Sequence, residues 1–397
     1  MSTLPVGTQP EPHEAGHSRQ RAWVEIDAGA IRDNTRVLCS SLAGGSSLMA
    51  VVKADGYGHG AVPVAQAALA GGARCFGVAT LAEGVQLRQA GIHAPVLVLG
   101  NLIQAEELRS CLRWQLMPTL SGMREALLCQ NLAAASGRPM AVHLKLDTGM
   151  ARLGIDWQEG PRLVAAIAEL NDIRLDGVYS HLACADADPH SDAEGDRFNN
   201  SQQQRFEQVL ASLRQQNLDP GCRHLANSAA TLRGAHFHYD MVRVGLALYG
   251  HSPAPHLGGS TALRPAMQLR ARVSLIREVA AGVGVSYSHR FRTSRPSRLA
   301  VVGIGYADGV PRQLSGQISV LHQGRAIPQV GAITMDQLVL DATDAPELEV
   351  GSIVTLLGGD AGLEISPSDW AQRAQTIPWE ILCGFKHRLP RLPLGVH

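Results

Sequence analysis

Lys53 stands where an apolar run opens into a glycine-rich segment, Ala-Val-Val-Lys-Ala-Asp-Gly-Tyr-Gly-His-Gly at residues 50–60. The run 48–52 is typical of a buried strand, and the glycines after it predict a loop that bends sharply or lies close to a ligand. Partial burial favours the neutral amine of Lys53, the form that makes a Schiff base with a carbonyl compound. Tyr57 adds a hydroxyl group nearby. The alternative interpretation is a structural lysine whose ammonium group reaches solvent from a strand end.

Other candidate catalytic or binding residues lie within or just after later apolar runs. In chain order they are Lys145, Asp147, Arg152, His181, His224, Asn227, Ser228, Arg243, Gly245 and Leu246. The pairs 227–228 and 245–246 could bind a phosphate through a hydroxyl and backbone N–H groups. Two alternatives stay open: Ser228 is equally consistent with a helix N-cap, and His181 with a hydrogen-bonded core histidine.

A Schiff-base lysine combined with a phosphate-binding cup points to pyridoxal 5'-phosphate as the cofactor. Arg243 lies in an apolar run, and a buried guanidinium keeps its charge and therefore needs a partner. The pyridine nitrogen of the cofactor is a candidate for that partner. No metal is expected, because the seven cysteines are scattered and form no Cys-x-x-Cys pair.

The elements that must position these residues alternate between strand and helix. Eight apolar runs predict strands at 48–52, 75–79, 95–99, 116–120, 141–146, 175–179, 222–225 and 241–244. Amphipathic stretches between them predict helices at 64–69, 81–89, 104–112, 123–132, 161–170 and 197–215. This alternation favours an α/β fold, a (β/α)8 barrel, in which the candidate residues would gather at the carboxyl ends of the strands. A doubly wound sheet is the alternative, but the Gly-x-Gly-x-x-Gly turn that would support it is missing.

The pattern changes near Ala262, after which β-rich runs are separated by Gly, Pro and Asp. We therefore expect a disordered tail at 1–20, a cofactor-binding barrel at 21–264 and a mainly β domain at 265–397. The chain has 397 residues and a formal net charge of zero, so nothing favours binding to nucleic acid or an anionic membrane. We find no apolar run of about 18 residues and no secretory signal, and we expect a cytoplasmic protein.

Seven segments, in order, resemble motifs of the bacterial alanine racemase family, whose members are fold-type III pyridoxal phosphate enzymes. They lie at residues 50–60, 145–154, 224–228, 241–250, 305–309, 335–337 and 388–391. The resemblance covers about residues 21–391. It implies a homodimer in which the barrel of one chain faces the β domain of the other, so that each active site is shared. It also implies that the strand at 23–27 pairs with the β domain.

The resemblance also implies the roles of the site residues. Lys53 and Tyr287 of the partner subunit would be the two catalytic bases, acting on the D- and L-isomers of alanine respectively. The implied cofactor contacts are Lys53, Tyr57, His181, Asn227, Ser228, Arg243, Gly245, Leu246 and Trp379, and the implied substrate contacts are Arg152, Tyr306 and Met335. His224 would orient Arg243, and Lys145 is carbamylated in some family members.

Trp379 departs from the commonest family pattern, in which a tyrosine binds the cofactor phosphate at that position. Thr334 stands where cysteine is frequent. The implied function is interconversion of L- and D-alanine, which supplies D-alanine for peptidoglycan. Three alternatives stay open: a racemase for serine or several amino acids, a fold-type III decarboxylase, and a pyridoxal phosphate carrier without turnover. The His-x-Gly-Ser and Cys-Glu-Ser segments expected of the decarboxylase are missing.

Overall fold

The structure, a computed structural model, describes residues 21–259 and 261–394. The expected tail at 1–20 lies outside the described residues. The chain divides into two compact units, one formed by residues 27–266 and the other by the first strand together with residues from 267 onward.

Parallel strands form the framework of the first unit. They are β2 (Ser47–Val51), β3 (Cys75–Val78), β4 (Val96–Asn101), β5 (Met117–Leu120), β6 (Met140–Asp147), β8 (Ile173–Tyr179), β9 (Cys222–His224) and β10 (Met241–Val244). Their order is β10-β2-β3-β4-β5-β6-β8-β9, and β7 (Ile155–Asp156) pairs only with β6. Between the two end strands, the N–H of Arg243 donates to the carbonyl of Ala226 at 2.9 Å. The sheet is therefore a nearly closed barrel, and the predicted (β/α)8 fold is confirmed.

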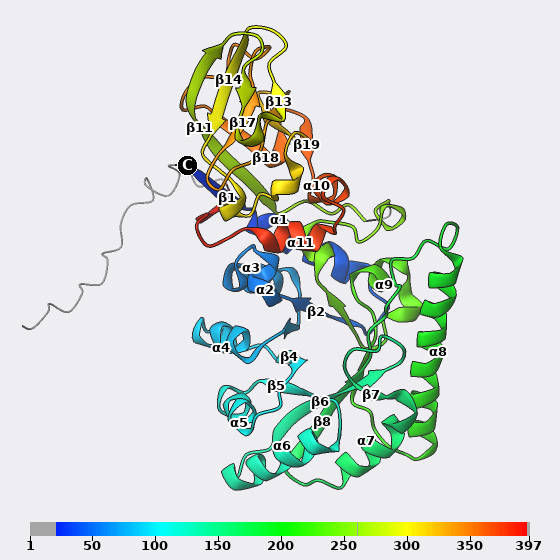
Figure 1. Cartoon of the computed structure of the whole chain (residues 1–397). Helices are drawn as coiled ribbons and strands as arrows, with labels where there is room; N and C mark the ends of the chain where they lie inside the picture. The colour runs from blue at the N-terminus through cyan, green and yellow to red at the C-terminus, as the bar shows by residue number, and fades with distance from the viewer. Residues whose placement is uncertain (1–20, 260, 395–397) are drawn as a thin grey trace, which may run out of the picture. The chain divides into compact units, whose positions relative to one another are not determined.

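Helices follow most strands and lie on the outer side of the barrel (Figure 1). They are α1 (Ala28–Ser40), α3 (Ala61–Gly71), α4 (Leu81–Gln89), α5 (Ala105–Trp114), α6 (Met123–Ser136), α7 (Gly160–Ala168), α8 (Ala193–Gln215) and α9 (Ser228–Arg233). Local signals start and stop them. Thr80 and Glu83 form a capping box at the start of α4, and Gly137 ends α6 in the left-handed conformation. Among the described residues, no helix combines the length and apolar character needed to cross a membrane.

The second unit is mainly β, as predicted. Its strands are β1 (Ala22–Ile26), β11 (Met267–Val279), β12 (Gly284–Val285), β13 (Phe291–Arg292), β14 (Ser297–Val302), β15 (Ser319–His322), β16 (Arg325–Val330), β17 (Leu338–Asp341), β18 (Ile353–Asp360), β19 (Leu363–Ile365) and β20 (Arg391–Pro393). Two helices, α10 (Pro367–Ala374) and α11 (Pro378–Gly384), lie near the end of the chain.

The long strand β11 closes this sheet on itself. Its first part pairs with β18 and its second part with β14, and the remaining neighbours run β18-β15-β16-β17-β14. A ring of strands results, which leaves fewer exposed edges than an open sheet. The N-terminal strand β1 pairs antiparallel with β11 and parallel with β20, so it belongs to this unit.

Gly250 ends the short 3-10 helix η4 (Leu246–Tyr249) with a φ of 91°, and a Cβ there would lie 1.9 Å from the carbonyl oxygen of Arg264. Gly45 has nearly the same φ, 90°, and open space around it. We predict that Gly45→Ala lowers the free energy of unfolding by about 1 kcal/mol, the cost of a left-handed alanine. Gly250→Ala adds a backbone clash and should cost about 3 kcal/mol. Equal losses in urea unfolding would show that the clash relaxes freely.

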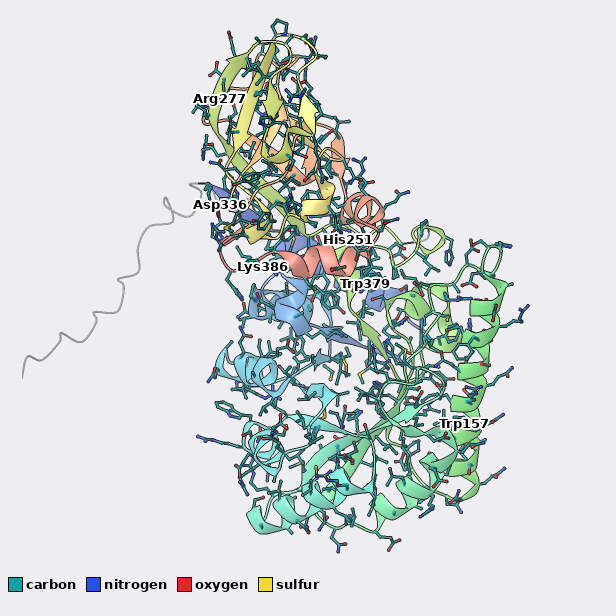
Figure 2. The ribbon with its side chains drawn as sticks, in the orientation of Figure 1. Trp157, His251, Arg277, Asp336, Trp379 and Lys386 are labelled. Atoms are coloured by element: carbon teal, nitrogen blue, oxygen red, sulfur yellow. The ribbon has the colours of Figure 1, made fainter. Side chains whose placement is uncertain are left out.

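His251 is buried in the barrel unit (labelled in Figure 2), and burial lowers its pKa from 6.5 to about 4. The unfolded chain therefore takes up this proton at a higher pH than the folded chain, so stability is full above pH 6.5 and falls as the pH drops toward 4. We predict that His251→Leu removes part of this acid sensitivity, on the order of 3 kcal/mol. Urea unfolding at neutral and acidic pH measures it, and an unchanged pH dependence would contradict the assignment.

Candidate active site

Lys53 begins α2 (Lys53–Tyr57), a single turn directly after β2. The sequence predicts a loop here, with its sharp bends at glycines. The bends are not confined to the glycines, because Ala54, Asp55 and Tyr57 also have positive φ values, between 52° and 53°. Each non-glycine residue in this region costs about 1–2 kcal/mol. Such strain persists only where the surroundings enforce it, and it concentrates at functional sites.

Two carboxylates hold the strained turn in place. Glu83 of α4 accepts a hydrogen bond from the N–H of Ala54 at 2.7 Å. Asp55 accepts one from the N–H of Ala61, at the start of α3, at 2.9 Å. The position of Lys53 is thus set by α3 and α4, not by the strand alone.

Tyr57 lies against Gly245, which follows β10. A Cβ on Gly245 would fall 2.5 Å from the Tyr57 hydroxyl, so only glycine leaves room for this contact. The N–H of Gly245 donates to the hydroxyl oxygen of Ser228 at 2.9 Å. Leu246 follows in η4, and the Asn227 side chain caps α9 by accepting from the N–H of Ala230 at 3.0 Å.

Tyr57, Asn227, Ser228, Gly245 and Leu246 therefore converge. The N-cap of α9 is Asn227, so the alternative role of Ser228 as the N-cap is wrong. The Ser228 hydroxyl oxygen accepts bonds from the N–H groups of Gly245 and Ala247, which leaves its own proton available to donate. Two hydroxyl groups beside a helix start and a bare glycine form a donor set that suits a phosphate.

Arg243 lies on β10 and is only 4% exposed. Its Nη2 donates to the carbonyl oxygens of Ser180 at 2.7 Å and Leu225 at 3.0 Å. Its Nη1 donates to the carbonyl oxygen of His224 at 3.1 Å. Among the described residues, no carboxylate forms an ion pair with Arg243. Burial consequently lowers its pKa to about 10, and the guanidinium still carries its charge at neutral pH.

The same guanidinium fixes the protonation of two histidines. It approaches Nδ1 of His224 and Nδ1 of His181, each at 3.2 Å. A guanidinium can only donate, so both Nδ1 atoms are acceptors and each ring carries its proton on Nε2. Burial and the Arg243 charge lower the pKa of both imidazoles well below the usual range. His181 therefore offers a neutral ring with an N–H donor at Nε2.

Lys145 is a buried lysine on β6, and burial, followed by the charges of Arg243, Arg152 and Lys53, lowers its pKa to about 8. Its ammonium nitrogen lies 5.5 Å from the centre of the Tyr179 ring. Arg152 is exposed beyond the end of the strand. Four basic groups thus share one end of the barrel, and their combined positive charge favours an anionic ligand.

The remaining predicted residues belong to the β unit. Tyr287, Tyr306 and Met335 are 68%, 39% and 53% exposed, although all three are large. The N–H of Tyr306 donates to the carbonyl of Thr334 at 3.0 Å, so the segments carrying Tyr306 and Met335 are adjacent.

Strained backbone presents the Tyr287 side chain to solvent. Ser286, the residue before it, has φ 61° and ψ −166°, a region that glycine normally occupies. The Ser286 hydroxyl donates to the carbonyl of Ala332 at 2.7 Å, close in sequence to Met335. Trp379 is half-buried on α11 (Figure 2). The unit therefore holds Tyr287 in a constrained turn with its ring exposed.

Sequence reasoning missed several residues of the barrel site: Glu83, Thr119, His143 and Tyr179. His143 precedes Lys145 by two residues on the same strand, so the period of two places both side chains on one face. That alternation was a usable signal. Glu83 gave no such signal, because its capping box accounts for its presence without reference to Lys53.

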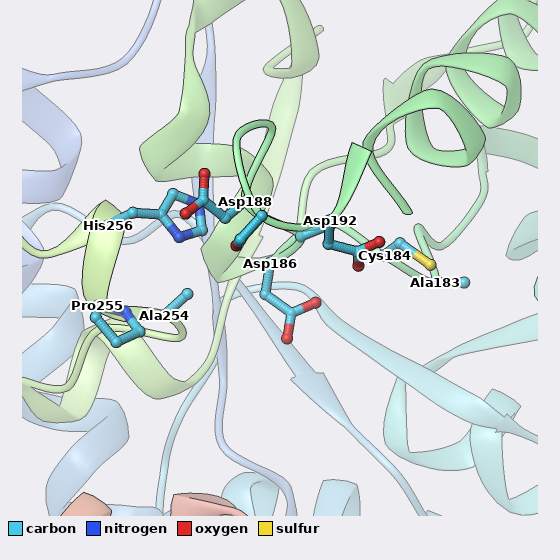
Figure 3. Close-up of a pocket in the computed structure, with 10 residues that line it drawn as sticks. Ala183, Cys184, Asp186, Asp188, Asp192, Ala254, Pro255 and His256 are labelled. Carbon is cyan, nitrogen blue, oxygen red and sulfur yellow. The ribbon is translucent and has the colours of Figure 1, made fainter. Parts of the chain in front are cut away.

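A separate hollow of about 520 Å³ lies between the segment after β8 and residues 254–256 (Figure 3). Asp186, Asp188, Asp192 and His256 line it. The backbone N–H of His190 donates to Asp188 and lowers the pKa of that carboxyl. The described residues that line the hollow include none of the predicted site residues. Nor does the described part of the chain contain a group of three His, Cys, Asp or Glu side chains suited to a metal ion.

Comparison with known proteins covers almost the whole chain. The alanine racemase N-terminal domain matches residues 26–253, and the alanine racemase C-terminal domain matches residues 266–393. An alanine racemase of Prochlorococcus marinus is 54% identical over 94% of this chain and 96% of its own length. One of Nostoc sp. is 50% identical over the same shares of the two chains.

Solved structures agree with these matches. The alanine racemase from D-cycloserine-producing Streptomyces lavendulae has a TM-score of 0.87 at 41% identity, over 95% of this chain and 98% of that one. The alanine racemase from Bacillus anthracis with bound L-Ala-P has a TM-score of 0.86 at 34% identity, over 95% and 96%. With both domains matched in order and half of the residues identical to curated relatives, the chain belongs to the alanine racemase family.

Proposed function

We propose that this protein is a pyridoxal phosphate-dependent alanine racemase that interconverts L- and D-alanine. The observation that carries the proposal is the combination of Lys53 on a strained turn, a phosphate-type donor set at Gly245, and a buried, uncompensated guanidinium at Arg243. Family membership adds the reaction class. A serine or broader amino-acid racemase would use the same groups and is distinguished by its substrate.

The described residues fit pyridoxal phosphate. The cofactor, when bound, supplies an aldehyde for covalent attachment and a ring that withdraws electrons from the substrate α-carbon. Lys53 would carry it through its amine. Ser228, Tyr57 and the N–H of Leu246 would bind its phosphate beside the bare backbone of Gly245, and Asn227 would cap the helix start beside them. Arg243 would donate to the pyridine nitrogen and keep that nitrogen unprotonated.

Two groups on opposite faces of the α-carbon would move the proton. Lys53 Nζ would serve the D-isomer, and the phenol oxygen of Tyr287 from the partner subunit would serve the L-isomer. Inversion needs both, because a single base tends to return the proton to the face it came from. A tyrosine is a poor base at neutral pH, and an N–H donor favours its phenolate. His181 offers such a donor at Nε2.

The β unit would complete the site of a second copy in a homodimer. The high exposure of Tyr287, Tyr306 and Met335 supports this, because large apolar surface is normally covered. Tyr306 and the backbone of Met335, with Arg152, would hold the substrate carboxylate.

Trp379 would contribute a single N–H donor to the phosphate, where the family pattern has a tyrosine hydroxyl.

The cellular setting is a further part of the proposal. None of the seven cysteines, all of which lie among the described residues, is in a disulfide, which suits a reducing cytoplasm. There the enzyme would supply D-alanine for peptidoglycan.

The direct test uses purified protein with L-alanine in deuterated water, followed by detection of α-deuteration and of D-alanine. We expect both, together with a visible absorbance band from cofactor bound through Lys53. Lys53→Ala should lose that band and the exchange. L-Serine in the same assay distinguishes an alanine racemase from a serine or broader amino-acid racemase. Bound cofactor without any exchange would overturn the proposal and indicate a carrier.

We predict that Tyr287→Phe affects the two isomers unequally. Without the phenol oxygen, deuterium exchange into L-alanine should fall by about 100-fold or more, whereas exchange into D-alanine through Lys53 should fall by less than about tenfold. Mass spectrometry of each isomer after short incubation measures the two rates. Equal losses would contradict the assignment of the two faces.

A further inference from the structure

His143 has no role in the function proposed above, yet it is buried beside the cluster around Arg243. It lies on β6, is 3% exposed, and its Nδ1 is 3.0 Å from Nε2 of His224. The two rings meet edge to face, with centroids 5.1 Å apart. His143 therefore reaches the Arg243 guanidinium through a single residue, His224.

The barrel backbone makes room for this ring. The pairing of β6 with β8 shifts register between Val142 and His143, and His143 then lies opposite Gly177. A Cβ on Gly177 would fall 2.7 Å from both Nδ1 and Cε1 of His143. A bulge in the register and a glycine together admit the imidazole at this position.

The direction of the hydrogen bonds follows from chemistry alone. Arg243 can only donate, so Nδ1 of His224 accepts. A neutral His224 then carries its proton on Nε2, and that proton points at Nδ1 of His143. His143 must accept, which places its own proton on Nε2. The two hydrogen bonds therefore point in one direction: Arg243 donates to His224, and His224 donates to His143.

A second restraint fixes the plane of His224. Its ring stacks on Tyr179 with centroids 4.6 Å apart and planes 13° from parallel. The Tyr179 hydroxyl lies 2.8 Å from the Thr119 hydroxyl, whose own proton goes to the carbonyl of Val98 at 2.7 Å. Stacking holds the plane of the His224 ring but cannot select its tautomer. The hydrogen-bond partners select it together: Arg243 donates at Nδ1, and His143 accepts at Nε2.

We propose that His143 is a positioning residue that holds His224 in the Nε2-protonated tautomer and thereby keeps Arg243 aimed at the cofactor ring. This inference rests on the proposed function. Without an acceptor at position 143, the Nε2 proton of His224 is buried and unsatisfied, which costs free energy. The other tautomer relieves that cost but turns an N–H toward the N–H of Arg243. In either case the guanidinium loses a fixed contact on one side.

The consequence is chemical as well as structural. If Arg243 no longer kept the pyridine nitrogen unprotonated, the cofactor would withdraw electrons more strongly. It would then favour, more than in the wild type, the side reaction in which the amino group of alanine is exchanged for the aldehyde oxygen of the cofactor, so that alanine leaves as pyruvate and the cofactor keeps the amine. Pyruvate formed per racemisation event therefore reports the orientation of Arg243, and a general loss of folding does not raise it.

The test compares His143→Leu with His143→Asn in the holoenzyme, because the amide oxygen of asparagine can accept where Nδ1 does. His251→Leu is the matched control, a buried histidine of the same unit whose Nε2 has no hydrogen-bond partner among the described residues. We expect His143→Leu to lower kcat by about tenfold with KM changed less than about threefold, and to raise pyruvate per turnover. His143→Asn should restore both, and His251→Leu should leave both unchanged.

A readout independent of turnover is 15N NMR of histidine-labelled protein, with the His224 signals assigned by comparison with His224→Gln. We expect an unprotonated Nδ1 and a protonated Nε2 in the wild type and in His143→Asn, and a shift toward mixed tautomers in His143→Leu. A folded His143→Leu variant with wild-type tautomer and pyruvate ratio would overturn the inference. So would His143→Asn behaving like His143→Leu. If the wild type itself does not racemise alanine, the proposed function fails, whereas the tautomer measurement still decides the role of His143.

Discussion

A buried positive charge without a carboxylate partner is the constraint on which the barrel site depends. Taking a guanidinium out of water costs several kcal/mol unless every donor finds an acceptor. At the two Nη groups, Arg243 meets this requirement chiefly with backbone carbonyls from the ends of β8 and β9, at Ser180, His224 and Leu225. These carbonyls are available because parallel strands present their carboxyl ends at one rim. The barrel topology thus solvates the cation in place of water.

The charge then sets the state of its neighbours. His181, His224 and His143 have lowered pKa values, mainly through burial, with the Arg243 charge contributing to each. They stay neutral, and their tautomers follow from which atoms face a donor. A neutral imidazole is also the only form that can accept from a guanidinium, so the electrostatics and the hydrogen bonds require the same protonation state. This agreement lets a polar cluster persist inside a barrel that is otherwise apolar.

Backbone strain supplies the second organising feature, and in each unit one strained turn lies at a predicted site residue. In the barrel, Ala54, Asp55 and Tyr57 are held in left-handed conformations by Glu83 and Asp55. In the β unit, Ser286 holds a conformation typical of glycine directly before Tyr287. Both strained turns carry a residue proposed as a base. Strain of this kind limits the orientations of the side chain, which serves proton transfer better than a mobile loop would.

Much of the fold and part of the site could be predicted from the sequence, because the relevant signals are local. The alternation of apolar runs and amphipathic stretches predicted every strand of the barrel to within a few residues, and Lys53 and Arg243 were recognisable as a lysine at a strand end and a charge in an apolar strand. Tertiary structure decided what local patterns do not contain. The acceptors of Arg243 come from segments dozens of residues apart in the sequence. The turn at Lys53 is held by Glu83, which also forms the capping box of α4, so the sequence gives no sign of its contact with Ala54. The place of His143 depends on a register shift opposite Gly177. Hydrogen-bond direction arises only when donors and acceptors from different strands meet, so tautomer and orientation belong to the fold and not to any single stretch of chain.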